Sequence, residues 1–192
     1  MGREFELKYA ATEKVLSDLA KQYPGGQKIA METSYFDSED GLLSGKKMTL
    51  RTRAENGLSL CTLKTPLPDG SRGEWECPAE DIGDGIQKLL SMGAPQELES
   101  LTKAGLYKVC AARFTRYAVT VATGDGLAEL ALDSGLLLGG GRERPLCEVE
   151  VELKSGSEEA AVALAAEIAR SYGLRPEPKS KFRRAMDLAQ GE

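Results

Sequence analysis

Hydrophobic and polar residues alternate over several short stretches of the chain, the pattern of β-strands with one buried face. In one such stretch, three glutamates alternate strictly with Val149, Val151 and Leu153. Turn-forming Gly, Pro, Asn and Asp residues separate several of these stretches, and together they predict eight strands. The predicted strands cover roughly residues 3–9, 30–37, 47–54, 58–64, 73–78, 109–122, 127–133 and 145–154.

Three other stretches have the period of an amphipathic helix, namely residues 11–23, 81–92 and 157–172. The last of them ends at Gly173, and a further helix is predicted to begin near Ser180. Strands at short spacing, joined mostly by hairpins, favour an antiparallel barrel or a strongly curved sheet. The predicted fold class is therefore α+β, with helices flanking an antiparallel sheet.

Length and composition are those of a single globular domain covering residues 1–192, with 29% charged and 41% hydrophobic residues. The net charge of −5 argues against general nucleic-acid binding, which a basic domain would favour. No apolar run approaches the ~20 residues that span a bilayer, and the first residues do not resemble a signal peptide. We therefore expect a cytoplasmic protein that binds neither nucleic acid nor membrane.

The chain contains no histidine, and its four cysteines lie far apart in the sequence. Histidine-based triads, the common zinc sites and Cys-x-x-Cys redox motifs are thereby excluded. Any catalysis must rest on carboxylates, lysine, arginine, tyrosine or a hard metal ion.

Charged residues recur on single faces of the predicted strands. In the first strand Glu4, Glu6 and Lys8 share one face, because side chains alternate along a strand. A single row of this kind is typical of a solvated surface strand. Like charges in one row repel each other, however, and a ligand of opposite charge between the rows would relieve this repulsion. The other rows are Arg51 and Arg53; Lys64; Glu74 and Glu76; Glu129 and Asp133; and Glu148, Glu150 and Glu152.

The residue types in these rows indicate their ligands. Carboxylates without histidine or cysteine suit hard cations such as Mg²⁺ or Mn²⁺. Arginine and lysine suit phosphate oxygens, and a barrel of about eight strands can enclose one small ligand. The basic segment 179–184 adds further cations, either on the surface or at a phosphate-binding helix start. The rows together predict a metal-dependent polyphosphate site inside a barrel.

The ordered set of these charged segments resembles the CYTH domain, the family of triphosphate tunnel metalloenzymes. The opening Glu-x-Glu-x-Lys at residues 4–8 is that family's signature, and the other matching segments follow in family order from residue 33 to residue 184. The resemblance implies a closed, eight-stranded antiparallel β-barrel, a tunnel open at both ends, with flanking helices. It implies a small-molecule triphosphate as substrate, Mg²⁺ or Mn²⁺ as cofactor, and leaves a homodimer as an open alternative.

The resemblance also implies roles for individual residues. The residues expected to bind the triphosphate are Lys8, Arg51, Arg53, Lys64, Lys179, Lys181, Arg184 and one arginine of the pair Arg113 and Arg116, of which Arg116 fits the family register better. The expected metal ligands are Glu4, Glu6, Asp133, Glu148, Glu150 and Glu152. Glu74, Glu76 and Glu129 match acidic positions without a clear role. Tyr35 and Lys64 resemble a catalytic pair near the attacking water, although a packed aromatic residue is the simpler interpretation of Tyr35.

Within the family, the resemblance favours hydrolysis of inorganic triphosphate to pyrophosphate and phosphate. Thiamine or nucleoside triphosphatase activity is the alternative. A class IV adenylate cyclase is disfavoured, because members of that class carry a His-Phe pair and this chain has no histidine. A non-catalytic polyphosphate or nucleotide-binding module would not need so complete a set of acidic rows.

Overall fold

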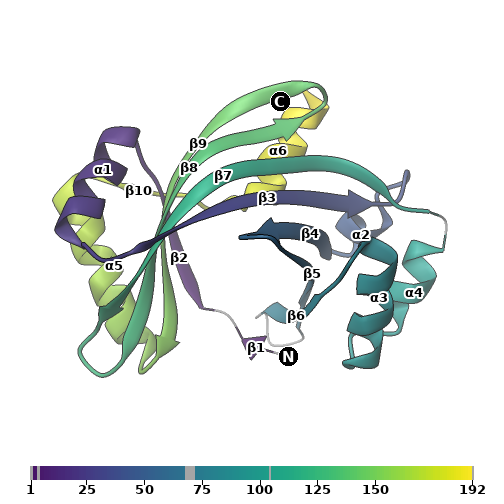
Figure 1. Cartoon of the computed structure of the whole chain (residues 1–192), viewed down its shortest axis with the longest axis horizontal. Coiled ribbons are helices and arrows are strands. Elements are labelled where there is room, and N and C mark those ends of the chain that lie inside the picture. The colour runs from purple at the N-terminus through teal and green to yellow at the C-terminus, as the bar shows by residue number, and fades with distance from the viewer. Residues whose placement is uncertain (1, 4, 68–71, 104, 192) are drawn as a thin grey trace.

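The computed structural model of the chain describes residues 2–3, 5–67, 72–103 and 105–191. Within these residues, ten strands form one antiparallel, strongly curved sheet, and six helices flank it (Figure 1). The strands are β1 Gly2–Arg3, β2 Glu6–Ala10, β3 Gln27–Asp37, β4 Thr49–Glu55, β5 Leu58–Pro66, β6 Arg72–Pro78, β7 Tyr107–Ala122, β8 Leu127–Gly139, β9 Arg142–Ser155 and β10 Arg175–Pro176. The helices are α1 Glu13–Gln22, α2 Leu42–Gly45, α3 Ile82–Ser91, α4 Glu97–Thr102, α5 Glu158–Tyr172 and α6 Lys181–Gln190.

The order of the strands brings the N-terminal segment to both ends of the sheet. The order is β1-β6-β5-β4-β3-β7-β8-β9-β2-β10, so β1 pairs with β6 whereas β2 pairs with β9. In the described part of the chain no strand pairing joins the β1 end to the β10 end. The hydrogen bonds therefore define an open sheet, and the expected closed barrel is not confirmed.

Three apolar clusters fix the helices on the sheet. Helices α1 and α5 cover β8 and β9 through a cluster that includes Leu19, Val151 and Ile168. Helices α3 and α4 cover β4 to β6 in the same way, and these two groups of helices lie at opposite sides of the molecule in Figure 1. Helix α6 packs against the concave face instead, where Phe182 contacts Tyr35 with ring centroids 5.2 Å apart.

The predicted strands and helices are present in the structure, but several of them begin or end at other residues than predicted. The predicted first strand is divided into β1 and β2, and α2, α4 and β10 were not predicted. Strands β8 and β9 are also longer than expected, because they continue to a tight hairpin at Gly140 and Gly141. Both residues have positive φ, 57° and 73°, which glycine adopts without steric cost.

None of the helices in the described part of the chain is both long and apolar enough to cross a bilayer.

Candidate active site

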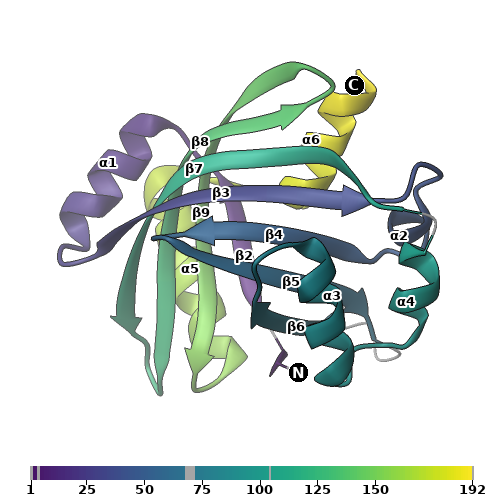
Figure 2. The same ribbon diagram turned by 45° about the vertical axis from the view of Figure 1, so that its right-hand side comes forward.

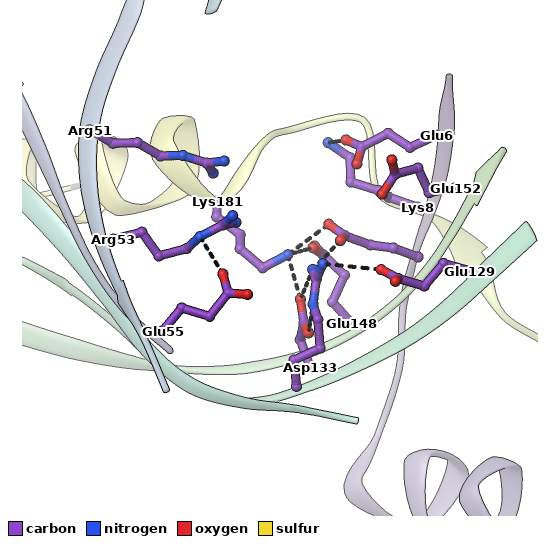
Figure 3. A network of polar contacts seen from close by, with 12 residues as sticks. Glu6, Lys8, Arg51, Arg53, Glu55, Glu129, Asp133, Glu148, Glu152 and Lys181 are labelled. Atoms are coloured by element: carbon purple, nitrogen blue, oxygen red, sulfur yellow. Dashed lines mark hydrogen bonds and ion pairs between the residues drawn. The ribbon is translucent and has the colours of Figure 1, made fainter. Parts of the chain in front are cut away.

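The concave face of the sheet collects the charged rows. Side chains alternate along a strand, so the residues of each row point to the same side of the sheet. In Figure 2, β2 passes behind β4 and β5, and the curvature of the sheet brings these strands to face each other. Figure 3 shows the result: Arg51 and Arg53 of β4 point across the cavity toward Lys8 and the carboxylates of β2, β8 and β9.

Two adjoining cavities lie along this face. The first has a volume of about 200 Å³ and the second about 490 Å³, and Arg51, Arg53, Arg116 and Glu152 line both of them. These shared residues make the two cavities neighbouring parts of one passage. The other charged residues of the first cavity are Glu6, Lys8, Lys64, Arg72, Glu150 and Lys181. Those of the second are Glu55, Glu74, Glu76, Glu129 and Lys154.

On the β4 to β6 side, glutamates hold the cations in place. Glu74 lies 3.8 Å from Arg51 and 3.6 Å from Lys64. Glu76 lies 3.4 Å from Arg53 and accepts a hydrogen bond of 2.7 Å from the hydroxyl of Thr62. Glu74 and Glu76, whose role the sequence left unclear, thus contact cations on their own wall of the cavity. Ion pairs of this kind orient the arginines for a ligand.

Opposite them, Lys181 of α6 lies among three carboxylates. Its ammonium group is 2.8 Å from Asp133, 2.7 Å from Glu150 and also in contact with Glu148. Oxygen atoms of these three carboxylates lie within 4.8 Å of one another, a spacing that suits a metal ion. In this structure the lysine ammonium holds that position.

Two arginines complete this buried network. Arg116 donates two hydrogen bonds of 2.8 Å to the two oxygens of Asp133, and it also contacts Glu150. Arg184 contacts Glu148. Three cations therefore face three carboxylates within the network. Such pairs fix the geometry even where their net contribution to stability is small.

Burial and these contacts shift the pKa values of the network. Burial raises the pKa of Glu148 to about 7, although Lys181 favours its ionised form. Burial also disfavours ionisation of Glu150, but Lys181 and Arg116 outweigh it and hold the pKa of Glu150 well below its ordinary value. For Lys181, burial lowers the pKa, and Glu150, Asp133 and Glu148 together raise it more strongly. Lys181 is therefore a permanent cation at physiological pH.

Several residues expected at the site lie elsewhere. Arg113 of β7 is three positions from Arg116 and so faces the outer surface, where it pairs with Glu32 at 3.6 Å. Lys179 lies at the surface before α6 and pairs with Asp187 at 2.7 Å. Lys179 is therefore outside the cavities, contrary to the expectation, and of the pair Arg113 and Arg116 only Arg116 lines them. Glu4 lies outside the described residues.

Asp133 and Glu148 are brought close to the cavity but not into it. Both are completely buried, and neither is among the residues that line the two cavities. A metal ion in the cavity would meet Glu6, Glu150 and Glu152 instead. Glu129 lines the second cavity and lies 3.9 Å from Arg116.

Tyr35 lines the first cavity but is only 3% exposed. Burial raises the pKa of its hydroxyl, and this effect outweighs the nearby Arg51 and Lys181. The hydroxyl therefore stays protonated at neutral pH and is suited to donate a hydrogen bond rather than to act as a base. Its packing against Phe182 agrees with the simpler interpretation of a packed aromatic residue.

Arg72 was not among the residues that the sequence predicted at the site. It lines the first cavity, and it precedes Glu74 and Glu76 at the same alternating spacing. Extending the row by one step toward the N-terminus would have found it.

The sequence and the fold place the chain in a known family. The family model of the CYTH domain matches residues 2–186, and the chain belongs to this family. An inorganic triphosphatase of Haemophilus influenzae is 30% identical over 167 residues, which are 82% of this chain and 47% of that protein. The chain thus spans about half the length of this curated relative.

Solved structures show the same fold. A candidate adenylyl cyclase from Hippeastrum, reported to have a dominant triphosphatase activity, superposes with a TM-score of 0.67 at 19% identity, covering 98% of this chain and 96% of that one. A candidate adenylate cyclase from Bacillus halodurans superposes with a TM-score of 0.64 at 22% identity, covering 96% and 98%. At these identities the likeness concerns the fold alone.

Proposed function

We propose that this protein hydrolyses inorganic triphosphate to pyrophosphate and phosphate with the help of Mg²⁺ or Mn²⁺. The observation that carries the proposal is the first cavity, in which basic side chains outnumber acidic ones and the two kinds face each other. The excess of cations suits a compact polyanion, and the acidic group suits a metal ion bound to it. Membership of the CYTH family and the inorganic triphosphatase of Haemophilus influenzae support the same activity.

In this proposal Glu6, Glu150 and Glu152 hold the metal ion. All three line the first cavity, and a donor set of carboxylate oxygens fits a hard divalent ion. The buried trio is less suitable, because Asp133 and Glu148 line neither cavity. When bound, the metal ion would neutralise phosphate charge and lower the pKa of a bound water.

The residues of the chain then bind and orient the substrate. Arg51, Arg53 and Lys64 contact phosphate oxygens from one wall, and Lys8 and Arg116 contact them from the other. Water attacks the terminal phosphorus and releases a proton to the solvent, and the bond to the bridging oxygen breaks with its electron pair going to the pyrophosphate. The negative charge that develops there is stabilised by these cations. Preorganised by Glu74 and Glu76, the cations need little rearrangement as the charge moves.

We further propose that the passage is a closed tunnel. The N-terminal segment supports this, since β1 pairs with β6 and β2 pairs with β9 at the other end of the sheet. The two cavities with shared lining residues are consistent with the two halves of such a tunnel. The cytoplasmic location and the homodimer stay predictions.

The activity is tested by measuring phosphate release from inorganic triphosphate, ATP and thiamine triphosphate, each with Mg²⁺, Mn²⁺ or EDTA. We expect fast release from inorganic triphosphate with metal and none with EDTA. A preference for ATP or thiamine triphosphate would make the protein an organic triphosphatase. Binding without any phosphate release would identify a non-catalytic module and contradict the proposal.

The metal site is tested by changing Glu152 to glutamine. Loss of one carboxylate ligand is expected to weaken Mn²⁺ binding by at least about tenfold. Calorimetric titration of Mn²⁺ measures this without turnover. The matched control is Glu143→Gln, which changes an exposed glutamate on the same strand, outside both cavities. Equal affinity of the two variants would contradict the proposed ligand set.

A further inference from the structure

We propose that Arg72 is a further substrate-binding residue, which contacts the phosphate group at the outer end of the bound chain. The inference rests on the proposed function and deepens it, because it extends the phosphate site beyond the positions expected from the sequence. Three observations carry it: the direction of the Arg72 side chain, its place in the cavity, and the ion pairing of its guanidinium group compared with that of the neighbouring cations.

The direction of Arg72 follows from the strand that carries it. Arg72 is the first residue of β6, two and four positions before Glu74 and Glu76, so all three face the concave side of the sheet. Its guanidinium group donates a weak hydrogen bond of 3.4 Å to the hydroxyl of Thr49. Thr49 lines the same cavity and is the strand partner of Lys64. Arg72 therefore lies beside the proposed phosphate-binding cations.

Arg72 lies at the exposed rim of the first cavity. Arg51, Arg53 and Arg116 line both cavities, whereas Arg72 lines only the first. Arg72 is also exposed, whereas the side chains of Arg51 and Lys64 are 17% and 18% exposed. A phosphate chain held at the shared arginines would meet Arg72 last.

Arg72 differs from the neighbouring cations in its ion pairing. Lys8, Arg53 and Lys64 each lie close to a carboxylate, at 3.5 Å, 3.1 Å and 3.6 Å. Within the described ranges of the chain, Arg72 forms no ion pair. Its charge is therefore available to a ligand, and a guanidinium group can bind a terminal phosphate through two parallel hydrogen bonds. Because Arg72 is exposed, that contact requires little desolvation.

A contact at the end of the passage predicts dependence on chain length. In the proposed arrangement pyrophosphate would lie among the inner cations, whereas tripolyphosphate and tetrapolyphosphate would extend further toward Arg72. We expect Arg72→Gln to weaken tetrapolyphosphate binding about five- to tenfold, tripolyphosphate binding less, and pyrophosphate binding by less than about twofold. Arg72→Lys keeps the charge but loses the paired hydrogen bonds and is expected to fall between wild type and Arg72→Gln.

Calorimetric titration of the full chain in EDTA with these three anions measures binding without turnover. The matched control is Arg113→Gln, which removes the same charge from the outer face of the sheet and should bind all three anions like wild type. An equal loss for all three lengths, or an unchanged affinity of Arg72→Gln, would overturn the inference.

Kinetics give a second, separate readout. If the protein releases phosphate as proposed, Arg72→Gln should raise KM for tripolyphosphate with little change in kcat, because the contact serves binding alone. If the wild-type protein binds the anions and releases no phosphate, the proposed activity fails, and the titrations still decide the role of Arg72. A fall in kcat with unchanged KM would contradict a binding role.

Discussion

Replacing Lys181 with methionine is expected to lower the free energy of unfolding by about 3–5 kcal/mol at pH 8 and to abolish activity. Its ammonium group contacts three buried carboxylates, of which Asp133 and Glu148 are completely buried. Without it, these carboxylates lie close together with only Arg116 and Arg184 to balance them. Removing one partner from a buried charge network is far more costly than removing a surface pair.

The loss of unfolding free energy in Lys181→Met should depend on pH, and the direction of this dependence follows from the pKa of the buried carboxylate Glu148. Burial already raises the pKa of Glu148 to about 7, against an ordinary value of 4.5. A carboxyl group whose pKa is raised in the folded state contributes stability that is complete below its unfolded pKa and is lost as the pH rises through its folded pKa. Lys181 opposes this rise, so its removal is expected to raise the pKa of Glu148 further. The variant should therefore be less impaired at pH 5 than at pH 8.

Urea unfolding at pH 5 and pH 8, followed by circular dichroism, measures both effects. The matched control is Lys179→Met, because Lys179 is half-exposed just before the same helix, and its partner Asp187 keeps a second cation, Arg183, at 2.7 Å. Losing an exposed lysine from a carboxylate that keeps another cation is expected to cost about 1 kcal/mol or less. If Lys181→Met unfolded like Lys179→Met at pH 8, the network would not anchor α6 to the sheet.

Replacing Arg53 with glutamine is expected to reduce kcat/KM for inorganic triphosphate by about 100- to 1,000-fold. Arg53 lines both cavities and is held by Glu55 at 3.1 Å and Glu76 at 3.4 Å. In the proposed mechanism it lies where a bound phosphate chain would cross from one cavity to the other, so its charge is expected to act on the developing anion.

Steady-state phosphate release with saturating Mg²⁺ measures this effect. Arg53→Lys keeps the charge but not the planar pair of donors and should recover only part of the activity. Arg113→Gln, with the same loss of charge on the outer face, should remain close to wild type. Activity of Arg53→Gln within about twofold of this control would remove Arg53 from the proposed substrate site.

The sequence predicts the elements of the fold well where the alternation is strict. Strand β9 follows directly from the glutamates that alternate with Val149, Val151 and Leu153, and the end of α5 follows from Gly173. The division of the first strand could not be predicted, because it depends on pairing with β6 and β9, which are remote in sequence. The short helices α2 and α4 have too few turns to show a period.

The face of each charged residue was predictable, but its partners were not. Alternation places Glu148 and Glu150 on one face, yet it does not reveal that Lys181 would reach between them from α6. The same limit applies to Lys179 and Lys181: they are two residues apart, but one lies at the surface and the other is directed into the network. Only the docking of α6 on the concave face distinguishes them.

The division of the N-terminal segment has a consequence for how the molecule is made. Strands β4 to β6 pair with their sequence neighbours, as do β7 to β9, and such hairpins close short loops at low entropic cost. Strand β2, however, pairs residue 6 with residue 152. On the ribosome, the row that carries Lys8 is synthesised well before β9, yet it cannot take its place until β9 has emerged. The passage can therefore be completed only late in folding, after the two meanders have formed.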